Sequence, residues 1–558
     1  MKRIAVTIMV LVLAVGLTGC LGGDGGKLTP DQAAEQLDAL AKKVSYKTID
    51  HQPDPNYISD DDVISALPTL EKYPLAVTGR GAIDVEIFSS TEKSNVKKPG
   101  WLDKMAAEFN KSDMKIAGKS VSVSVRPVAS GAALDYITSR VHIPDAYTPS
   151  NELWGLMVEG AGVPIDKVAG KLTGNVAGIA IKPEVYKSLS TTYGKNLSFA
   201  DILDAVEKKQ AVLGYTNPNT SSTGLNVLTQ TLKVFDADNP LSQTAIDEFS
   251  AFQQTVPRTP QTTDEMASIA AKGMMSVATL EAQAQSTQPL LKDWKFIPVG
   301  VRHDSPMYLL NDAPAEKRAV LEAFVKFCQS DEAQKEATSF GFNKYNEYAG
   351  VTNTYTGTEL FAALQLWKQN KDSGRPVISV FVVDRSGSME GEKILNVKKA
   401  LLGALPSISE GNSIGLVSYS GQHDITLDMP ITKISQIDQS AQFKFAGAVA
   451  DLQTDGQTAT NSALVVALKL LRDAQAQTPD AKLRIFLLSD GQTNEGLVFN
   501  RVIDVVEGLG VPVYSIGFEV PEGLDDLKEL SSRNEASYLD AQSDDVIYKI
   551  RSLFISEM

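Results

Sequence analysis

From residue 377 the chain runs Val377-Ile378-Ser379-Val380-Phe381-Val382-Val383-Asp384-Arg385-Ser386-Gly387-Ser388-Met389. The first seven residues are mostly β-branched or aromatic, which is typical of a central strand that is buried on both faces of a sheet. In the turn that follows, Asp384, Ser386 and Ser388 can present three oxygen atoms from one loop. Hard divalent cations prefer oxygen ligands. The stretch therefore predicts a buried strand with a candidate cation site at its carboxyl end.

Two further segments supply oxygens of the same kind. Thr458 lies in Gly456-Gln457-Thr458, shortly before a predicted amphipathic helix over 462–475, and a second buried strand over 484–489 ends in Asp490. The alternative is that the two serines cap the first helix and that Asp490 caps another turn, as such residues do routinely. That alternative requires three separate segments to carry candidate metal ligands by coincidence, so we favour the metal site.

On these motifs, residues 376–558 resemble the von Willebrand factor A (VWA) domain, a doubly wound, Rossmann-like α/β fold. The resemblance implies a metal-ion-dependent adhesion site, whose five coordinating positions are here Asp384, Ser386, Ser388, Thr458 and Asp490. The family's Gly-Gly-Thr is Gly-Gln-Thr in this chain, which keeps the hydroxyl. The implied ion is Mg²⁺, with Mn²⁺ or Ca²⁺ as alternatives, and an open position on it would accept an acidic side chain from a protein partner.

The middle of the chain alternates short apolar runs with helical segments, which predicts an α/β domain with a largely parallel sheet. Small polar loops follow the predicted strands and contain Ser89, Ser90 and Ser130. Further on, the segment 214–226 brings consecutive hydroxyls, among them Ser221, Ser222 and Thr223, to the start of a helix. Free amide groups at such a position suit a small polar or anionic ligand, although plain helix capping is an alternative.

Residues 84–345 resemble bacterial extracytoplasmic solute-binding proteins of the type with two α/β lobes and two crossover segments. The segments that carry the resemblance are 176–181, 198–203, Asn217-Pro218-Asn219-Thr220-Ser221-Ser222-Thr223-Gly224 and 324–334. The resemblance implies a type 2 periplasmic-binding-protein-like domain over 80–350, with one lobe formed by about 80–163 and 295–345 and the other by 164–294. Its ligand residues would be Ser89, Ser90, Ser130, Ser221, Ser222 and Thr223, with Glu281 as a weaker candidate.

The N-terminus begins with Met1-Lys2-Arg3 and an apolar run from Ile4 to Leu17, which is too short for a permanent transmembrane helix and predicts a signal peptide over 1–19. It ends in Leu17-Thr18-Gly19-Cys20, which resembles a bacterial lipobox and implies a lipid anchor on Cys20. The alternative is an ordinary secretory signal with an incidental cysteine. Residues 20–79 are expected to form a lipidated tether with short helices, and 351–375 a linker.

The chain has 558 residues and a formal net charge of −15. Removal of residues 1–19 takes away Lys2 and Arg3 and no acidic residue, so the mature charge becomes −17. This sign disfavours nucleic-acid binding. The four histidines and two cysteines form no zinc-like pattern, and the sequence contains no phosphate-binding loop, serine nucleophile elbow or His-Glu-x-x-His motif. We therefore expect a binding protein and not an enzyme.

These features together predict a cell-envelope surface lipoprotein that is extracytoplasmic, anchored to the membrane by acyl chains, and bound to a protein partner through its divalent-metal site. The solute-binding-like domain would be a second binding or sensing module. One alternative is a solute receptor of a transport or sensing system, in which the VWA domain recruits a membrane complex. Another is a cell-envelope assembly factor, which shares the leading mechanism and differs in its partner.

Overall fold

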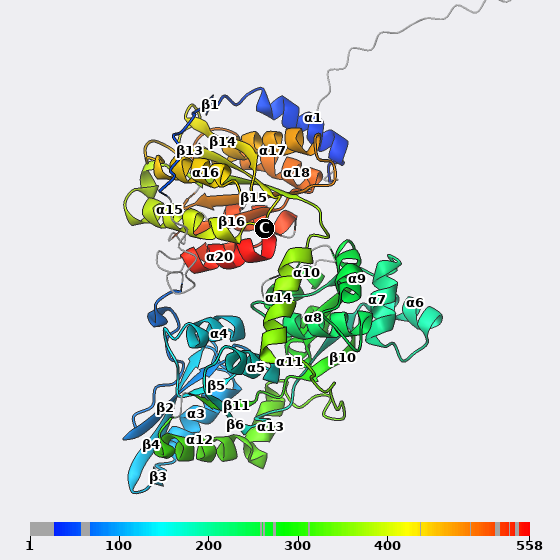
Figure 1. The fold of residues 1–558 in the computed structure, drawn as a ribbon, viewed down its shortest axis with the longest axis vertical. Helices are drawn as coiled ribbons and strands as arrows, with labels where there is room; N and C mark the ends of the chain where they lie inside the picture. The colour runs from blue at the N-terminus through cyan, green and yellow to red at the C-terminus, as the bar shows by residue number, and fades with distance from the viewer. Residues whose placement is uncertain are drawn as a thin grey trace, which may run out of the picture.

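The computed structural model describes residues 27–56, 67–256, 259–260, 263–271, 275–310, 313–435, 437–491, 493–518, 525–534, 536–541 and 546–558. The predicted signal peptide and Cys20 lie outside these residues. The described chain forms two modules (Figure 1): a seven-stranded module in the upper part of the view, and a two-lobed module below it that contains a six-stranded and a four-stranded sheet. The expected α/β fold class, two lobes plus a doubly wound domain, is confirmed.

The seven-stranded sheet is parallel except where β14 runs antiparallel to β13. In spatial order its strands are β1 (Lys47–Thr48), β14 (Ile425–Lys433), β13 (Ser413–Tyr419), β12 (Val377–Asp384), β15 (Lys482–Ser489), β16 (Val513–Phe518) and β17 (Tyr538–Ala541). The predicted strand after residue 376 is thus the middle strand of the sheet.

Helices cover both faces of this sheet. The first face carries α15 (Glu392–Ala404), α16 (Ser440–Ala450) and α20 (Val546–Glu557), with the 3₁₀ turns η3 (Gly387–Met389) and η4 (Leu405–Ser407). The second face carries α1 (Pro30–Ala41), α17 (Thr460–Gln475), α18 (Phe499–Leu509) and α19 (Asp525–Arg533). Alternate side chains of β12 enter the two cores: Phe381 and Val383 pack on the first face, Val380 and Val382 on the second. This two-sided burial explains why the strand is almost entirely apolar.

The N-terminal segment, for which a tether with short helices was expected over 20–79, packs on this module. Helix α1 packs on α17 and α18, strand β1 pairs with β14, and the Asp54 amide donates to the Phe443 carbonyl of α16 at 2.9 Å. The His51 ring lies between Asp428 (3.1 Å) and Asp451 (2.9 Å). The chain therefore passes from one face of the sheet around its β14 edge to the other face.

The first lobe of the two-lobed module contains a mixed sheet, and not the largely parallel one that the sequence pattern predicted. Its strands, in spatial order, are β3 (Lys115–Ile116), β4 (Lys119–Pro127), β2 (Ile83–Ser89), β5 (Ala146–Thr148), β11 (Met307–Leu310) and β6 (Ile165–Ala169). Strand β2 runs parallel to β4 and β5, whereas β3, β11 and β6 pair antiparallel with their neighbours. Strand β11 returns from the second lobe, which reverses its direction.

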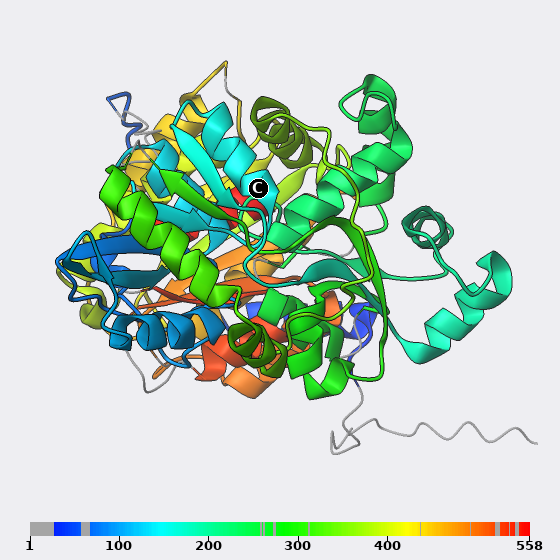
Figure 2. The ribbon, with the colours of Figure 1, turned by 90° about the horizontal axis from the view of Figure 1, so that it is seen from below.

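The second lobe has the strand order β10 (Lys295–Arg302), β7 (Val176–Ile181), β9 (Val277–Glu281) and β8 (Leu213–Gly214). Figure 2 shows the first lobe, with its blue strands, on the left and the second lobe, with its teal helices, on the right. Because β6 belongs to the first sheet and β10 to the second, the crossovers lie at 170–175 and 303–306. The expected boundaries at 163/164 and 294/295 each fall one strand too early.

Helices complete both lobes. Those of the first lobe are α3 (Trp101–Lys111), α4 (Ser130–Thr138), α5 (Glu152–Gly160), α12 (Ala315–Cys328) and α13 (Asp331–Ser339), with η1 (Leu70–Lys72) before them. Those of the second are α6 (Pro183–Tyr193), α7 (Phe199–Glu207), α8 (Ser222–Phe235), α9 (Gln243–Gln253), α10 (Thr263–Ala271) and α11 (Ala282–Thr287), with η2 (Pro289–Leu291).

The expected linker is an integral part of the two-lobed module. Helix α14 (Gly357–Asn370) packs on α5, α8 and α9, and its Trp367 is fully buried and donates to the Tyr215 hydroxyl at 2.7 Å. Only residues 371–376 then separate this core from β12. The two modules also meet directly, since the Tyr548 hydroxyl of α20 donates to Asp135 of α4 at 3.0 Å.

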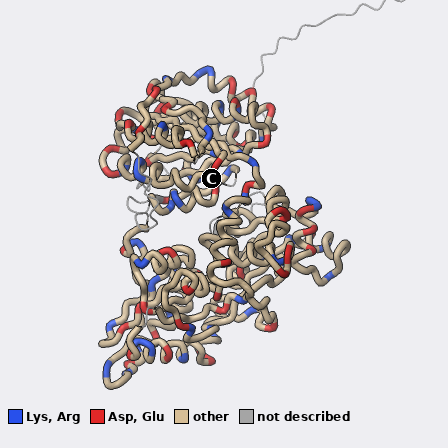
Figure 3. The backbone as a smooth tube through the Cα atoms, in the orientation of Figure 1, with Lys and Arg blue, Asp and Glu red and all other residues tan. Residues whose placement is uncertain are grey.

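Charged residues are spread over both modules (Figure 3), and the described residues of the two modules form no long basic stripe of the kind that binds nucleic-acid backbones. Within the described residues, no helix combines the length and apolar character that crossing a bilayer requires. The charge of the chain is therefore dispersed, so any binding specificity has to come from local arrangements of side chains.

We predict that Leu37→Ala destabilises the seven-stranded module. Leu37 is fully buried between α1 and the core of the sheet, so the truncation should cost about 2–5 kcal/mol. The measurement is hydrogen–deuterium exchange, with faster exchange expected in peptides of α1 and α17. The exposed neighbour Gln36 provides the control, and Gln36→Ala should leave exchange unchanged. Unaltered exchange in Leu37→Ala would mean that the N-terminal segment is not part of this core.

Candidate functional site

The carboxyl ends of β12, β13 and β15 meet the start of α17 at one edge of the seven-stranded sheet. Backbone hydrogen bonds hold the loops together: the Arg385 amide donates to the Tyr419 carbonyl at 2.8 Å, the Gly387 amide to the Gly456 carbonyl at 3.2 Å, and the Ala459 amide to the Ser420 carbonyl at 2.8 Å. These bonds join the loop after Asp384 to the segment 456–459, and both of these to the end of β13.

Four of the five predicted metal-site residues lie in one connected group of side chains. The Ser386 and Ser388 hydroxyls lie 3.0 Å apart, and the Ser388 hydroxyl donates to Asp490 Oδ1 at 2.8 Å. Asp384 accepts from the Ser386 amide at 2.8 Å. It also accepts from the Ser489 hydroxyl at 2.6 Å. The strand ends thus bring Asp490 to a carboxylate and two hydroxyls from a single loop that lies about a hundred residues earlier in the sequence.

The fifth residue, Thr458, lies on the loop that the Gly456 carbonyl joins to Gly387. Its backbone is fixed by Asn494, whose side-chain oxygen accepts from the Thr458 amide at 2.9 Å. Gly456 has a φ of +73°, a left-handed conformation that favours glycine. Gln457, which departs from the family's second glycine, is not among the residues with a positive φ, so the backbone of this loop tolerates a side chain there.

Charge compensation at this edge involves residues that the sequence analysis did not single out. Burial raises the pKa of Asp384 to about 6, against hydrogen bonds from Ser489 and Ser386 that lower it. Lys393, at the start of α15, forms a 2.6 Å ion pair with Asp490 Oδ2. Nothing in the sequence around Lys393 indicates that this lysine pairs with Asp490. The pair is recognisable only from the fold.

The donor set suits a hard cation. Among the described residues, no group of three or more His, Cys, Asp or Glu side chains is arranged to hold a metal. At this edge the oxygens come instead from two carboxylates and from hydroxyls, which are ligands that Mg²⁺ and Ca²⁺ accept and that soft metals do not favour.

A second candidate site lies between the lobes, in a cavity of about 800 Å³. Its walls include six of the seven predicted ligand residues, namely Ser90, Ser130, Ser221, Ser222, Thr223 and Glu281. The seventh, Ser89, does not line the cavity; it is fully buried, and its hydroxyl donates to the Ser90 carbonyl at 3.2 Å. Ser89 is the last residue of β2. Because successive side chains of an extended chain point to opposite sides, the Ser89 side chain points away from the cavity that Ser90 faces.

Hydrogen bonds across the lobes fix the cavity wall. The Ser222 hydroxyl accepts from Trp154 Nε1 at 2.8 Å and lies 3.4 Å from the Ser130 hydroxyl of the first lobe. Glu281 lies 2.6 Å from His303 Nδ1 and accepts from the Asn175 amide group at 2.9 Å. The polar wall is therefore pre-formed by a buried network. Ser130, Ser222 and Glu281 of this network were predicted from the sequence, whereas Trp154, Asn175 and His303 were not.

Carboxylates outnumber ammonium groups among the lining side chains, which include Glu92, Glu281, Glu336 and Lys98. Glu92 pairs with the fully buried Lys93 at 3.1 Å. Burial alone would raise the pKa of Glu92, but the Lys93 ammonium and the Ser90 hydroxyl lower it. Glu92 is thus held as a carboxylate at the wall of the cavity.

Comparisons with known proteins match each module to a separate family. Residues 97–343 match the model of the bacterial extracellular solute-binding proteins, and residues 380–551 match that of the von Willebrand factor type A domain. The chain thus combines a solute-binding-like module with a VWA-like module, named below the solute-binding module and the VWA module. The VWA match contains all five predicted metal-site residues, and both families are generally non-enzymatic.

Among curated proteins, the VWA module is similar to inter-alpha-trypsin inhibitor heavy chain H1 of Sus scrofa, with 29% identity over 177 residues. The match covers 30% of this chain and 18% of that protein, so the chain spans about a fifth of the length of this relative.

Among solved structures, a von Willebrand factor type A protein from Catenulispora acidiphila has 20% identity and a TM-score of 0.30, covering 33% of this chain and 43% of that one. The sulfate-binding protein SubI from Mycobacterium tuberculosis H37Rv has 16% identity and a TM-score of 0.35, covering 47% of this chain and 88% of that one.

Proposed function

We propose that this protein is an extracytoplasmic surface lipoprotein whose VWA module binds a protein partner through a divalent cation. The observation that carries the proposal is the connected group of Asp384, Ser386, Ser388 and Asp490 at the carboxyl edge of the sheet, next to the Thr458 loop. Mg²⁺ is the first candidate for the ion, with Mn²⁺ or Ca²⁺ as alternatives.

The proposed chemistry is recognition and not turnover. Asp384 and Asp490 would neutralise a dication, while the hydroxyls of Ser386, Ser388 and Thr458 would complete its oxygen shell. An acidic side chain of a partner would then occupy the remaining position. In a chain with a net charge of −15, attraction for such a partner has to come from a local positive centre, which the bound cation would supply.

The proposed lipid anchor has a geometric consequence. Lys27, where the described chain begins, comes seven positions after Cys20, and an extended chain of this length spans at most about 25 Å. Because α1 packs on the VWA module, an acylated Cys20 would hold this module close to the membrane surface. The solute-binding module would then lie on its far side, joined by residues 371–376.

We predict that the full chain binds Mg²⁺ or Mn²⁺ and that Asp490→Asn weakens this binding by at least about tenfold, since loss of a metal-site carboxylate costs at least as much as loss of a supporting group. Isothermal titration measures the affinity. Asp424→Asn is the matched control, because Asp424 lies at the same edge but pairs with Arg385. Equal affinity in Asp490→Asn and Asp424→Asn would disprove the site, as would an absence of metal binding.

Lys393 gives an independent test, because its ammonium competes with a cation for Asp490. Lys393→Gln should therefore raise the metal affinity by about two- to fivefold, the range expected for a partly exposed ion pair. Lys399→Gln, an exposed lysine of the same helix, should leave the affinity unchanged. A lower affinity in Lys393→Gln would show that Lys393 supports the site instead of competing for it.

A second candidate function is that of a solute receptor for a transport or sensing system. The observation that favours it is the 800 Å³ cavity lined by hydroxyls of both lobes. The sequence suggested a small polar or anionic solute. The excess of carboxylates in the lining favours a neutral polar or cationic one, because an anion would meet Glu92 and Glu281 at the wall.

We predict that one class among sugars, amino acids and organic cations raises the melting temperature and changes the tryptophan fluorescence, since Trp154 contacts the cavity residue Ser222. Ser221→Ala should weaken this response by about tenfold, the value of one or two hydrogen bonds. Ser112→Ala, on the same module but outside the cavity, should respond like the unaltered chain. If no class produces a response that depends on Ser221, the receptor function fails.

A further inference from the structure

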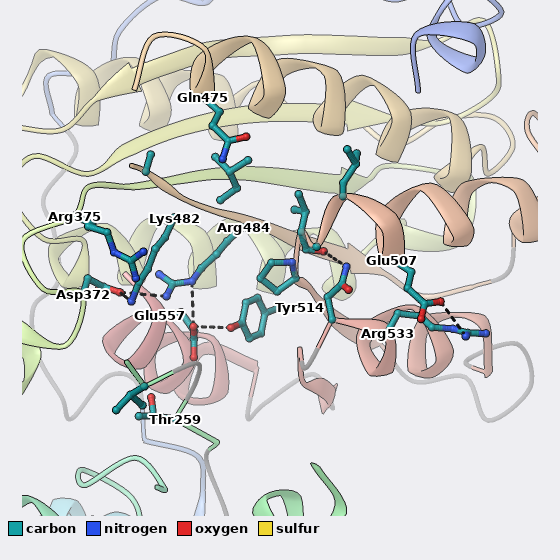
Figure 4. Close-up of a pocket in the computed structure, with 18 of the residues that line it drawn as sticks. Thr259, Asp372, Arg375, Gln475, Lys482, Arg484, Glu507, Tyr514, Arg533 and Glu557 are labelled. Atoms are coloured by element: carbon teal, nitrogen blue, oxygen red, sulfur yellow. Dashed lines mark hydrogen bonds and ion pairs between the residues drawn. The ribbon is translucent and has the colours of Figure 1, made fainter. Parts of the chain in front are cut away.

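A pocket of about 590 Å³ lies at the junction of the two modules, at the edge of the VWA sheet opposite the metal-site residues. Figure 4 shows Lys482 and Arg484 extending from β15 toward Asp372 and Glu557, with Thr259 of the solute-binding module below them. Lys371 and Arg375 of the connecting segment also line it. Three parts of the chain therefore enclose the pocket: the VWA sheet, the connector and the second lobe.

The charge of this pocket is opposite to that of the protein. Its lining contains six basic residues and three acidic ones, whereas the chain as a whole has an excess of acidic groups. The acidic residues already have basic partners. Asp372 pairs with Lys371 and, at 2.8 Å, with Lys482; Glu557 pairs with Arg484 at 3.1 Å. Elsewhere in the pocket, Lys27 and Arg533 pair with Glu507, and Arg533 also pairs with Glu529. The surplus therefore lies around Arg375 and Arg484, where Lys371, Arg375, Lys482 and Arg484 face only Asp372 and Glu557 among the described lining residues.

Two guanidinium nitrogens mark where a ligand would bind. Arg484 is 8% exposed, and its Nη1 has no hydrogen-bond partner within the described part of the chain, although Nε and Nη2 are used. The buried Nε of Arg375 also lacks a partner there. A buried donor without an acceptor costs stability, so two such donors in one cationic pocket indicate a missing acceptor.

The electrostatics of the neighbouring groups agree with this interpretation. Burial and the adjacent Arg484 lower the pKa of Lys482 to about 8, although Asp372 acts in the opposite direction. Burial also lowers the pKa of Lys371. Several cations that lie close together in a buried site are unfavourable because they are desolvated and repel one another, and a nearby negative charge offsets this cost.

We propose that the junction pocket binds a small doubly charged oxyanion, namely phosphate or the phosphate group of a small ester, between Arg375 and Arg484. Guanidinium groups match the geometry of such oxygens, and a dianion would offset the surplus charge. The volume exceeds what inorganic phosphate needs, which leaves room for an organic group. Because the connector and the second lobe form part of the wall, the anion would stabilise the contact between the two modules.

The test is a thermal-shift and isothermal titration series on the full chain in a phosphate-free buffer, with inorganic phosphate and glycerol phosphate as probes. Phosphate stabilises many proteins without binding to a site, so sodium chloride at equal ionic strength and sulfate serve as references. We expect a stabilisation that saturates below about 10 mM of the preferred probe. The probe with the higher affinity identifies the free anion or the ester as the ligand.

Arg375→Gln should weaken this binding by about tenfold or more, because it removes a charge-assisted hydrogen bond. Arg375 is half-buried and its Nε is unused, so the variant should fold normally. Arg318→Gln, an exposed arginine of the first lobe, is the matched control. Metal binding should be unchanged in Arg375→Gln, which separates this proposal from that of the metal site.

A second measurement is hydrogen–deuterium exchange of residues 371–376, which the bound anion should slow in the unaltered chain and not in Arg375→Gln. The proposal is overturned if neither probe stabilises the chain beyond the effect of sodium chloride, or if Arg375→Gln and Arg318→Gln respond alike.

Discussion

The burial of β12 and β15 on both faces is the constraint on which the VWA module depends. Strands covered by helices on both sides have to be apolar along their length, so polar groups can gather only at the two strand ends. Strand β15 illustrates this with Arg484 near its start and Asp490 directly after its end. Six residues of extended chain separate them by roughly 20 Å. The sheet thus carries an acidic, hydroxyl-rich edge and a basic edge on opposite sides.

The basic edge lies where the second module joins. Residues 371–376 leave α14, whose Trp367 is buried in the solute-binding module, and lead directly into β12. The Gln253 side chain of the second lobe donates to the Lys371 carbonyl at 3.3 Å, and the connector's Asp372 pairs with Lys482 of the VWA sheet. Residues 371–376 therefore contact both the second lobe and the start of the central strands.

Sequence reasoning succeeded where chemistry and spacing are local. The turn from Asp384 to Ser388, the hydroxyl-rich start of α8 and the strand that ends in Asp490 were each recognisable from a few consecutive residues. It failed where partners come from distant segments. The parallel sheet expected for the first lobe is mixed because β11 returns from the other lobe. Short helices were expected before residue 79, but not the packing of α1 and β1 on a module that begins some 300 residues later. No periodicity within a segment encodes such pairings.

The sequence by itself determined the fold class and the local motifs, since hydrophobic periodicity and turn chemistry act over a few residues. Only the tertiary structure decided which charges meet. Lys393 pairs with Asp490, His303 lies beside Glu281 at the wall of the cavity, and Arg484 and Arg375 line one pocket with surplus positive charge. The strength of an electrostatic interaction depends on distance and burial, and both are properties of the folded chain.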